Sequence, residues 1–151
     1  ESLVRDYSGR MARCRALSRQ QCRRPRVYFE EWDDPHISAI RWVSELIGIA
    51  GGDDIFPELA ASPSGAGRII ADSQEIVRRA PDIIIGSWCG KKFRPEKVAA
   101  RPGWQAIPAV AKGDLHEIKS AEILQPGPAA LTDGLDRLTG IIQDWQQREA
   151  A

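Results

Sequence analysis

An uninterrupted apolar run, Ile83-Ile84-Ile85, is the feature that most restricts the fold of this chain. The run follows Pro81-Asp82 and precedes Gly86, so residues that favour turns bound it on both sides. A strand that is apolar on both faces must be covered on both faces, which is typical of parallel sheets flanked by helices. The run therefore predicts the central strand of an α/β fold.

The segments around this strand are predicted to alternate between helices and strands. Spacings of three and four between apolar residues, or helix-capping signals, predict helices at 2–22, 36–49, 73–80, 95–100 and 128–147. Further short strands are expected at 26–30, 107–110 and 115–118, with a turn at 112–114 and an irregular loop at 57–71. Pro35 is expected to open the second helix and Gly51-Gly52 to end it. This alternation predicts a mostly parallel sheet with helices on both sides.

Charge and size exclude some classes of protein. The chain has 151 residues, 42% of them hydrophobic, which suits one compact domain, and no apolar run is long enough to span a membrane. Lys plus Arg and Asp plus Glu number 21 each, so no overall field favours nucleic acid. Eight arginines lie within residues 1–26. We favour a solvated helix face there over a basic arm that binds nucleic acid.

The cysteines do not form a recognisable framework. Cys14, Cys22 and Cys89 show neither disulfide-rich nor zinc-binding spacing. If Cys14 and Cys22 share a helix, they lie roughly 12 Å apart, which is too far for a disulfide. The chain begins at Glu1 within an amphipathic pattern, without a signal peptide, so we expect it to be a piece of a longer protein.

Three loops are the expected place of function, because ligands of open α/β sheets bind at the carboxyl ends of the strands. These loops are 31–35, 86–94 and 119–128. Trp32 and Trp88 each follow a predicted strand directly. Each is either a lid on the core or a flat platform for a ligand, and the sequence leaves both alternatives open.

An acidic cluster follows the first predicted strand and has two interpretations. Its members are Glu30, Glu31, Asp33, Asp34 and His36. Such a cluster could hold a metal, but we favour helix capping by Asp33 or Asp34 before Pro35. We therefore predict no metal site.

The stretch 86–92 also suggests two sharper functions that the residues support poorly. As a phosphate loop it departs from the Walker A spacing, and Lys92 stands where Ser or Thr is needed. A nucleophilic Cys89 would need a histidine base and an oxyanion site. His36 and His116 are the two histidines of the chain, and nothing in their spacing connects them to Cys89.

Several short motifs, in order, resemble the C-terminal half of the helical-backbone (class III) solute-binding proteins of ABC importers. Residues 2–22 resemble the long helix that joins the two lobes of that class, and 25–32 resemble the first strand of the second lobe. Residues 51–56 are similar to the family's "GG-x-N-I-F" turn, and 75–85 to its following helix and strand. Residues 85–91 and 125–128 are most similar to the members that bind cobalamin.

The resemblance implies a fold and a function. The fold would be a three-layer, Rossmann-like α/β lobe at 24–151, preceded by a connecting helix at 1–23, with the N-terminal lobe outside the chain. The implied function is capture of cobalamin or a related corrinoid between two lobes, and delivery to the membrane subunits of an ABC importer. The implied location is periplasmic, or extracytoplasmic with a membrane anchor. No catalysis, cofactor or nucleic acid is implied. A siderophore or haem ligand, or an enzyme dependent on Cys89, are the alternatives.

The resemblance also implies site residues by position. The ligand contacts would come from Trp32, Asp33, Arg68, Trp88, Cys89, Gly90, Lys91, Ser120, Glu122 and Gln125. Aromatic side chains suit a broad, flat ligand, which gains most from stacking and buried area. Arg68 replaces a tryptophan of the family and would suit phosphate or carboxylate groups. The glutamate with which the family docks on its permease corresponds to Gln74, and Glu75 is the nearest candidate for that contact.

Overall fold

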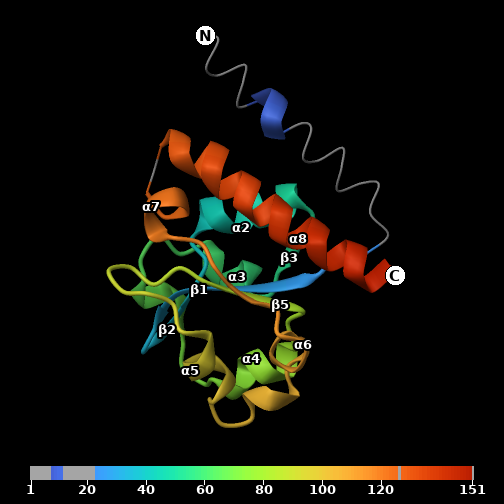
Figure 1. Ribbon diagram of the computed structural model, residues 1–151. Coiled ribbons are helices and arrows are strands. Elements are labelled where there is room, and N and C mark those ends of the chain that lie inside the picture. Colours follow the sequence, from blue (N-terminus) through green and yellow to red (C-terminus); the bar gives the residue numbers. More distant parts are fainter. Residues whose placement is uncertain (1–7, 12–22, 126, 151) are drawn as a thin grey trace.

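A computed structural model describes residues 8–11, 23–125 and 127–150 as an α/β lobe built on one mixed sheet (Figure 1). The strands are β1 (Arg26–Asp33), β2 (His36–Ser38), β3 (Asp53–Asp54), β4 (Ile69–Ile70), β5 (Ile83–Gly86) and β6 (Leu115–Glu117). Their order is β4-β2-β1-β5-β6, and β3 also pairs with β1. β1 is parallel to β3 and β5, and β5 is parallel to β6, whereas β2 and β4 form an antiparallel edge. The mostly parallel sheet confirms the predicted fold class.

Helices cover both faces of the sheet, as the central apolar strand predicted. The α-helices are α2 (Arg41–Ala50), α3 (Pro57–Ala60), α4 (Gln74–Arg79), α5 (Pro95–Ala99), α6 (Pro108–Lys112), α7 (Ser120–Ile123) and α8 (Leu135–Ala150). Shorter turns are η1 (Ala66–Arg68), η2 (Trp104–Ala106) and η3 (Ala130–Gly134), the last a π-helical turn that leads into α8. Figure 1 shows α2 and α8 above the sheet and α4, α5 and α6 below it.

Each face of the sheet has its own hydrophobic core, and β5 contributes to both. Ile83 and Ile85 pack with α2 and α8, whereas Ile84 packs on the other face with α4, α5 and η2. All three isoleucines are fully buried. Because successive side chains of a strand point to opposite faces, this one apolar run contributes to both hydrophobic cores.

The hairpin at Pro35 corrects the predicted start of the second helix. β1 runs on to Asp33, and the chain turns at a cis Asp34–Pro35 bond into β2, so residues 36–38 are a strand. α2 begins only at Arg41. The error has a physical reason: Ile37 and Ile40 suit either period over so few residues, and pairing with Trp32 and Ile69 selects the strand.

The predicted helix cap changes with this correction. Neither Asp33 nor Asp34 caps a helix, because the hairpin separates both from α2. Instead, the Ile40 N–H at the N-terminus of α2 donates to Glu31 Oε2 at 2.7 Å. The other end of α2 agrees with the prediction: Gly51 has φ 109°, a left-handed conformation that glycine adopts most easily.

Two other predicted segments differ in the structure. Residues 107–110 were predicted as a strand but lie at the start of α6, with Pro108 in its first turn and Gly113, at φ 76°, at its end. Four apolar residues cannot by themselves distinguish strand from helix, and a proline in the first turn favours a helix start. The predicted loop 57–71 contains α3, η1 and β4.

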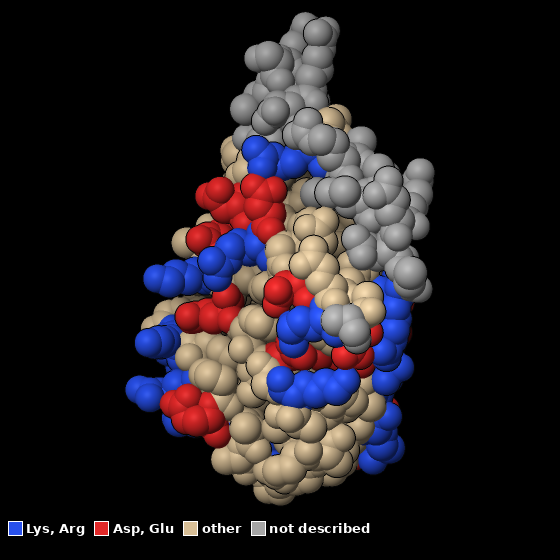
Figure 2. Space-filling view, turned by 45° about the vertical axis from the view of Figure 1, so that its right-hand side comes forward, with Lys and Arg blue, Asp and Glu red and all other residues tan. Residues whose placement is uncertain are grey.

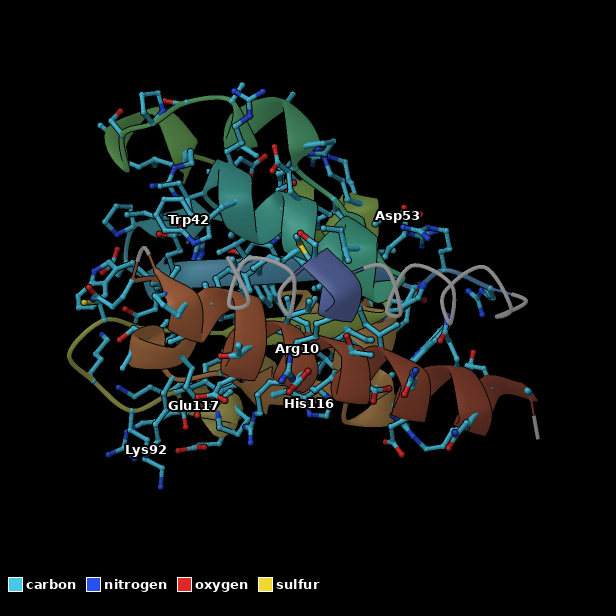
Figure 3. All side chains as sticks on the ribbon, turned by 90° about the horizontal axis from the view of Figure 1, so that it is seen from above. Arg10, Trp42, Asp53, Lys92, His116 and Glu117 are labelled. Atoms are coloured by element: carbon cyan, nitrogen blue, oxygen red, sulfur yellow. The ribbon has the colours of Figure 1, made fainter. Side chains whose placement is uncertain are left out.

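The remaining predicted elements are found near their expected positions, where the structure describes them. α4, α5 and β6 correspond to the predicted short helices and last strand, and η3 with α8 corresponds to the closing helix. Of the predicted helix 2–22, only 8–11 is described, as one helical turn; the rest, with Cys14 and Cys22, lies outside the described residues. Arg10 forms an ion pair with Asp136 at the start of α8 (Figure 3). The boundary between residues 23 and 24 stays a prediction.

The surface is consistent with the balanced charge. Figure 2 shows basic and acidic side chains interspersed over the described part of one face, without a patch of a single sign. No helix among the described residues is long and apolar enough to cross a membrane.

Candidate ligand-binding site

The carboxyl ends of three parallel strands lie side by side. Glu30 of β1 is paired with Gly86 of β5, and Gly86 is paired with Glu117 of β6. The segments that leave these strands therefore meet at one edge of the sheet, as expected for the ligand side of such folds.

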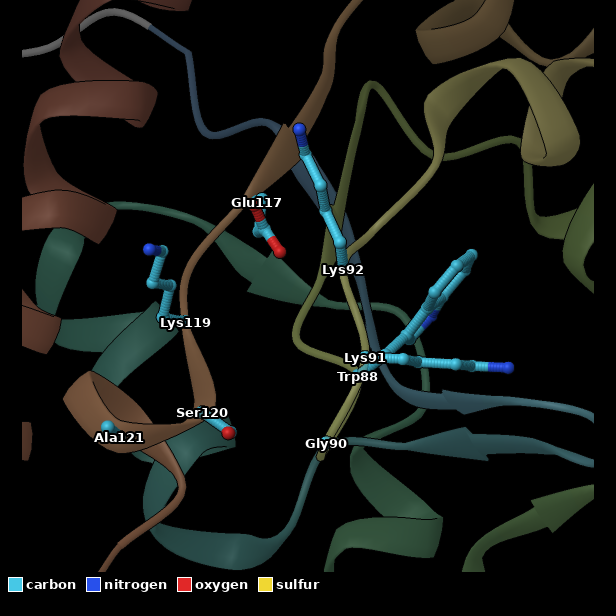
Figure 4. A pocket seen from close by; sticks show the side chains of 8 residues that line it. All are labelled: Trp88, Gly90, Lys91, Lys92, Glu117, Lys119, Ser120 and Ala121. Atoms are coloured by element: carbon cyan, nitrogen blue, oxygen red, sulfur yellow. The ribbon is translucent and has the colours of Figure 1, made fainter.

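A cavity of about 540 Å³ lies at this edge, between the loop after β5 and the segment after β6 (Figure 4). Its size falls within the range of roughly 300–1,000 Å³ that small-molecule sites occupy. The lining residues are Trp88, Gly90, Lys91, Lys92, Glu117, Lys119, Ser120 and Ala121.

The buried carboxylate of Glu30 contacts several side chains, including Trp88 of the cavity wall. Tyr28 Oη donates to Glu30 Oε2 at 2.7 Å, Trp88 Nε1 donates to Oε1 at 3.0 Å, and Arg101 donates to both oxygens at 2.8 and 2.9 Å. His36 Nδ1 lies 3.3 Å from Oε2. Burial alone would raise the pKa of Glu30, but the contacts with His36 and Arg101 outweigh it and lower this pKa to about 2. Glu30 is therefore ionised, and its negative charge is compensated by contacts inside the lobe.

Trp88 lies in the core rather than on the surface. Its side chain is 4% exposed and packs edge-to-face on Phe93, with ring centroids 4.9 Å apart. Gly86 allows this packing, because a Cβ at that position would lie 1.9 Å from the Phe93 ring. Of the two alternatives for this tryptophan, the structure favours the lid on the core, which supports the loop from below.

Lys91 connects the loop after β5 to the end of β1 through its contacts with Asp33 and Trp32. Its Nζ lies 2.7 Å from Asp33 Oδ1, and 4.5 and 5.2 Å from the ring centroids of Trp32 and Trp88. Such cation–π contacts contribute about 0.5–1 kcal/mol each at exposed positions. Asp33 and Trp32 thus act here as partners of Lys91.

The segment after β6 is held by the other layer. Trp42 Nε1 of α2 donates to the Ile123 carbonyl at 2.9 Å, which fixes α7 and with it Ser120. Glu117 Oε2 accepts the Phe93 N–H at 3.0 Å, so β6 is also joined to the loop after β5. Both walls of the cavity are therefore supported by contacts between distant segments.

Arg68 lies away from the cavity. It is 4% exposed, forms an ion pair with Glu31 and donates to the Ser38 carbonyl at 2.7 Å. Burial raises the pKa of Glu31, while Arg68 and the Ile40 N–H oppose that rise. The guanidinium is thus engaged inside the lobe and does not reach the cavity wall.

The structure brings together only part of the predicted contact set. Trp88, Gly90, Lys91 and Ser120 line the cavity, whereas Cys89, Glu122 and Gln125 belong to the same segments but do not line it. The list of predicted contacts omits four lining residues: Lys92, Lys119 and Ala121, which lie within the predicted loops, and Glu117 at the end of β6. Lys119 could have been found, because it follows directly on the last predicted strand.

The predicted docking residues lie on α4. Gln74 Nε2 donates to the Pro102 carbonyl at 2.8 Å. Glu75 pairs with Arg78 at 3.0 Å and with Arg79 at 3.2 Å, and these contacts lower its pKa. Glu75 is about one third exposed, so its carboxylate already has two partners in the lobe.

The described residues do not assemble a catalytic cysteine or a metal centre. Cys89 is free and exposed, while His36 lies beside Glu30, and His116 lies 3.7 Å from Asp114. Burial lowers the pKa of His116, against the effect of Asp114. Within the described part of the chain, no group of three or more His, Cys, Asp or Glu side chains could hold a metal ion.

Comparison with known proteins identifies the family. A family model described as "Periplasmic binding protein" matches residues 1–122. The chain belongs to this periplasmic binding protein family. A comparison with curated protein sequences finds no match.

Solved structures of periplasmic binding proteins share the fold. A periplasmic binding protein from Veillonella parvula is 25% identical with a TM-score of 0.74, and the match covers 95% of this chain and 50% of that one. The periplasmic vitamin B12 binding protein of Vibrio cholerae is 19% identical, with a TM-score of 0.67 and coverages of 95% and 53%. A periplasmic heme-binding protein from Roseiflexus is 23% identical, with a TM-score of 0.70 and coverages of 95% and 56%. The chain spans about half the length of these proteins.

Proposed function

We propose that this periplasmic binding protein chain is the C-terminal lobe of an extracytoplasmic solute-binding protein. The complete protein captures cobalamin or a related corrinoid between two lobes and delivers it to the membrane subunits of an ABC importer. The observation that carries the proposal is the cavity of about 540 Å³ at the carboxyl edge of the sheet, whose two walls are held by contacts between distant segments. The family assignment supports solute binding, and the resemblance of residues 85–91 and 125–128 to cobalamin-binding members supports the corrinoid.

The cavity has the form expected for half of a binding site. Two segments line it, 88–92 and 117–121, and no other described segment closes it. An N-terminal lobe, joined through residues 1–23, would supply the opposite wall. A large ligand would then gain contact area from both lobes on closure.

Binding rather than catalysis fits the chemistry of the site. The buried carboxylate of Glu30 accepts hydrogen bonds from Tyr28, Trp88 and Arg101, and its pKa is lowered. It would therefore not exchange a proton near neutral pH. His36 and His116 lie beside Glu30 and Asp114, and no hydrogen bond joins either of them to Cys89 in the described part of the chain. We therefore propose that the chain is not an enzyme.

Docking on the permease is proposed for the surface of α4. Glu75 is exposed enough to meet an arginine of a membrane subunit, which would compete with Arg78 and Arg79. Gln74 adds an uncharged side chain beside it. The full-length protein, with a membrane anchor or free in the periplasm, would present this surface to the transporter.

A haem or ferric siderophore ligand is the second candidate, and one observation favours it. Three of the lining residues are lysines, Lys91, Lys92 and Lys119, which suit a ligand with several negative groups. The fold of the heme-binding protein from Roseiflexus is also similar to that of this chain.

A visible absorption spectrum tests these candidates directly. The full-length protein would be purified from its native host without added ligand, and its spectrum separates a corrin, a haem and a ferric chelate. The proposal expects corrin bands. A Soret band would indicate haem and a broad ferric charge-transfer band a siderophore, and either result would favour the second candidate over cobalamin.

A further inference from the structure

Lys92 and Lys119 stand on opposite walls of the cavity, and neither has a partner among the described residues. Lys92 belongs to the loop after β5 and Lys119 to the segment after β6, and both side chains are exposed. Figure 4 shows them extending on either side of Glu117. Neither ammonium group forms an ion pair or hydrogen bond within the described part of the chain.

The charge that lines the cavity is positive. Three lysines face one acidic residue, Glu117, and one oxygen of that carboxylate accepts the Phe93 N–H at 3.0 Å. The charge of Lys91 is compensated by Asp33 at 2.7 Å, which leaves Lys92 and Lys119 in excess over Glu117. In a chain with equal numbers of acidic and basic residues, this excess is local.

Lys91 and Lys92 leave the loop in different directions. Lys91 is turned to the side of Trp88 and clamped by Asp33 and Trp32 (Figure 4). The adjacent Lys92, which also lines the cavity, points away from Lys91 and extends past Glu117. Ser120, at the start of α7, adds a hydroxyl group on the opposite wall.

We infer that the ligand of this cavity carries anionic oxygen groups, carboxylate or phosphate, which Lys92 and Lys119 hold from two sides with Ser120 as a hydroxyl donor. This inference rests on the proposed function, because it assigns a class of ligand to the same cavity. Lysine suits this role because its flexible stem and three donors adapt to anions at the rim of a large ligand, whereas arginine would demand one planar geometry.

Two kinds of chelate supply this chemistry, and three probes separate them. Ferric protoporphyrin IX carries two carboxylates, cyanocobalamin carries one phosphodiester, and the dimethyl ester of ferric protoporphyrin IX lacks both. Each probe would be titrated into the present chain by absorption difference. The variants are Lys92→Gln, Lys119→Gln and their combination, with the exposed Lys97→Gln on α5 as a control that removes the same charge elsewhere.

Each lysine substitution is expected to raise the Kd of the anionic probe about three- to tenfold, as for charged hydrogen bonds that are partly exposed. Lys97→Gln should leave the Kd unchanged, and no variant should alter the Kd of the dimethyl ester. Glu117→Gln, which keeps the acceptor for the Phe93 N–H, should lower the Kd of the anionic probe about twofold. If the lysine substitutions raise the Kd of ferric protoporphyrin IX, the groups that the lysines bind are carboxylates. If they raise the Kd of cyanocobalamin, the group is the phosphodiester.

Two results would overturn the inference. If a probe binds and its Kd is the same for wild type and all lysine variants, the cavity takes its ligand without the two ammonium groups, while the proposed function stands. If neither the chain nor the full-length protein binds any probe or a ferric siderophore at millimolar concentration, the proposed function fails and this inference fails with it. Thermal unfolding of each variant shows that the fold is intact.

Discussion

At the scale of single residues, Glu30 has the largest predicted effect on stability. Glu30→Gln removes the charge that compensates Arg101 and weakens the bonds from Tyr28 and Trp88. We expect the free energy of unfolding to fall by about 2–4 kcal/mol, since Arg101 would keep a largely buried charge without its partner. Urea denaturation measures this. Glu96→Gln, in an exposed pair with Arg94, is the control and should change stability by less than about 0.5 kcal/mol; an equal loss in both would contradict the role of Glu30.

The pKa of Glu30 also predicts how stability depends on pH. Because its pKa in the folded protein, about 2, lies below the ordinary value of 4.5, the folded state binds its proton less readily than the unfolded state. The resulting stabilisation is complete above pH about 4.5 and is lost as pH falls toward 2, by up to about 3 kcal/mol. The free energies of unfolding of wild type and Glu30→Gln should therefore converge as the pH falls. A difference between the two that stays constant with pH would count against the prediction.

Gly86 is predicted to tolerate no side chain. In Gly86→Ala the new Cβ would overlap the Phe93 ring, so Phe93 and then Trp88 must move, at a cost of about 2–3 kcal/mol in unfolding free energy. Gly48→Ala in α2 is a matched control, because a Cβ there would meet nothing within 4 Å apart from its chain neighbours and the backbone of its own helix. It should be neutral or stabilise the fold by about 0.5–1 kcal/mol. Chemical denaturation of both variants tests the contrast.

At the scale of elements, the loop between β5 and α5 is held by a few side-chain contacts rather than by regular structure. Lys91→Ala removes the ion pair with Asp33 and both cation–π contacts. Hydrogen exchange should become faster at residues 88–92, while global stability falls by no more than about 1–2 kcal/mol. Lys97→Ala should leave exchange in the loop unchanged. Unchanged exchange in Lys91→Ala would show that Trp88 and Phe93 hold the loop alone.

The elements also differ in how well the sequence predicts them. β5, α2 and α8 were predicted because their apolar pattern extends over enough residues, or is bounded by clear turn signals. β2 and α6 were not, because three to five residues fit both periods. Pairing with β1 and β4 decides the first, and a proline in the first turn decides the second.

At the scale of the whole molecule, the proposed two-lobed site leads to a prediction about affinity. We expect the present chain to bind cobalamin much more weakly than the full-length protein, because in the proposed arrangement one lobe would supply about half of the contacts and could not close around the ligand. Isothermal calorimetry on the two proteins measures the difference. Equal affinity would falsify the model of a cleft between lobes.

The sequence by itself determined the α/β class, the doubly covered strand at Ile83-Ile84-Ile85 and the edge of the sheet at which the ligand site is proposed, since these follow from local pattern and general topology. Only the tertiary structure decided how single side chains are used. Trp88 and Arg101 meet Glu30 across 58 and 71 residues, and Arg68 meets Glu31 across 37. Such pairings depend on how the strands are ordered and the loops are packed. For the same reason, only the structure shows that Lys92 and Lys119, from two different segments, line the same cavity.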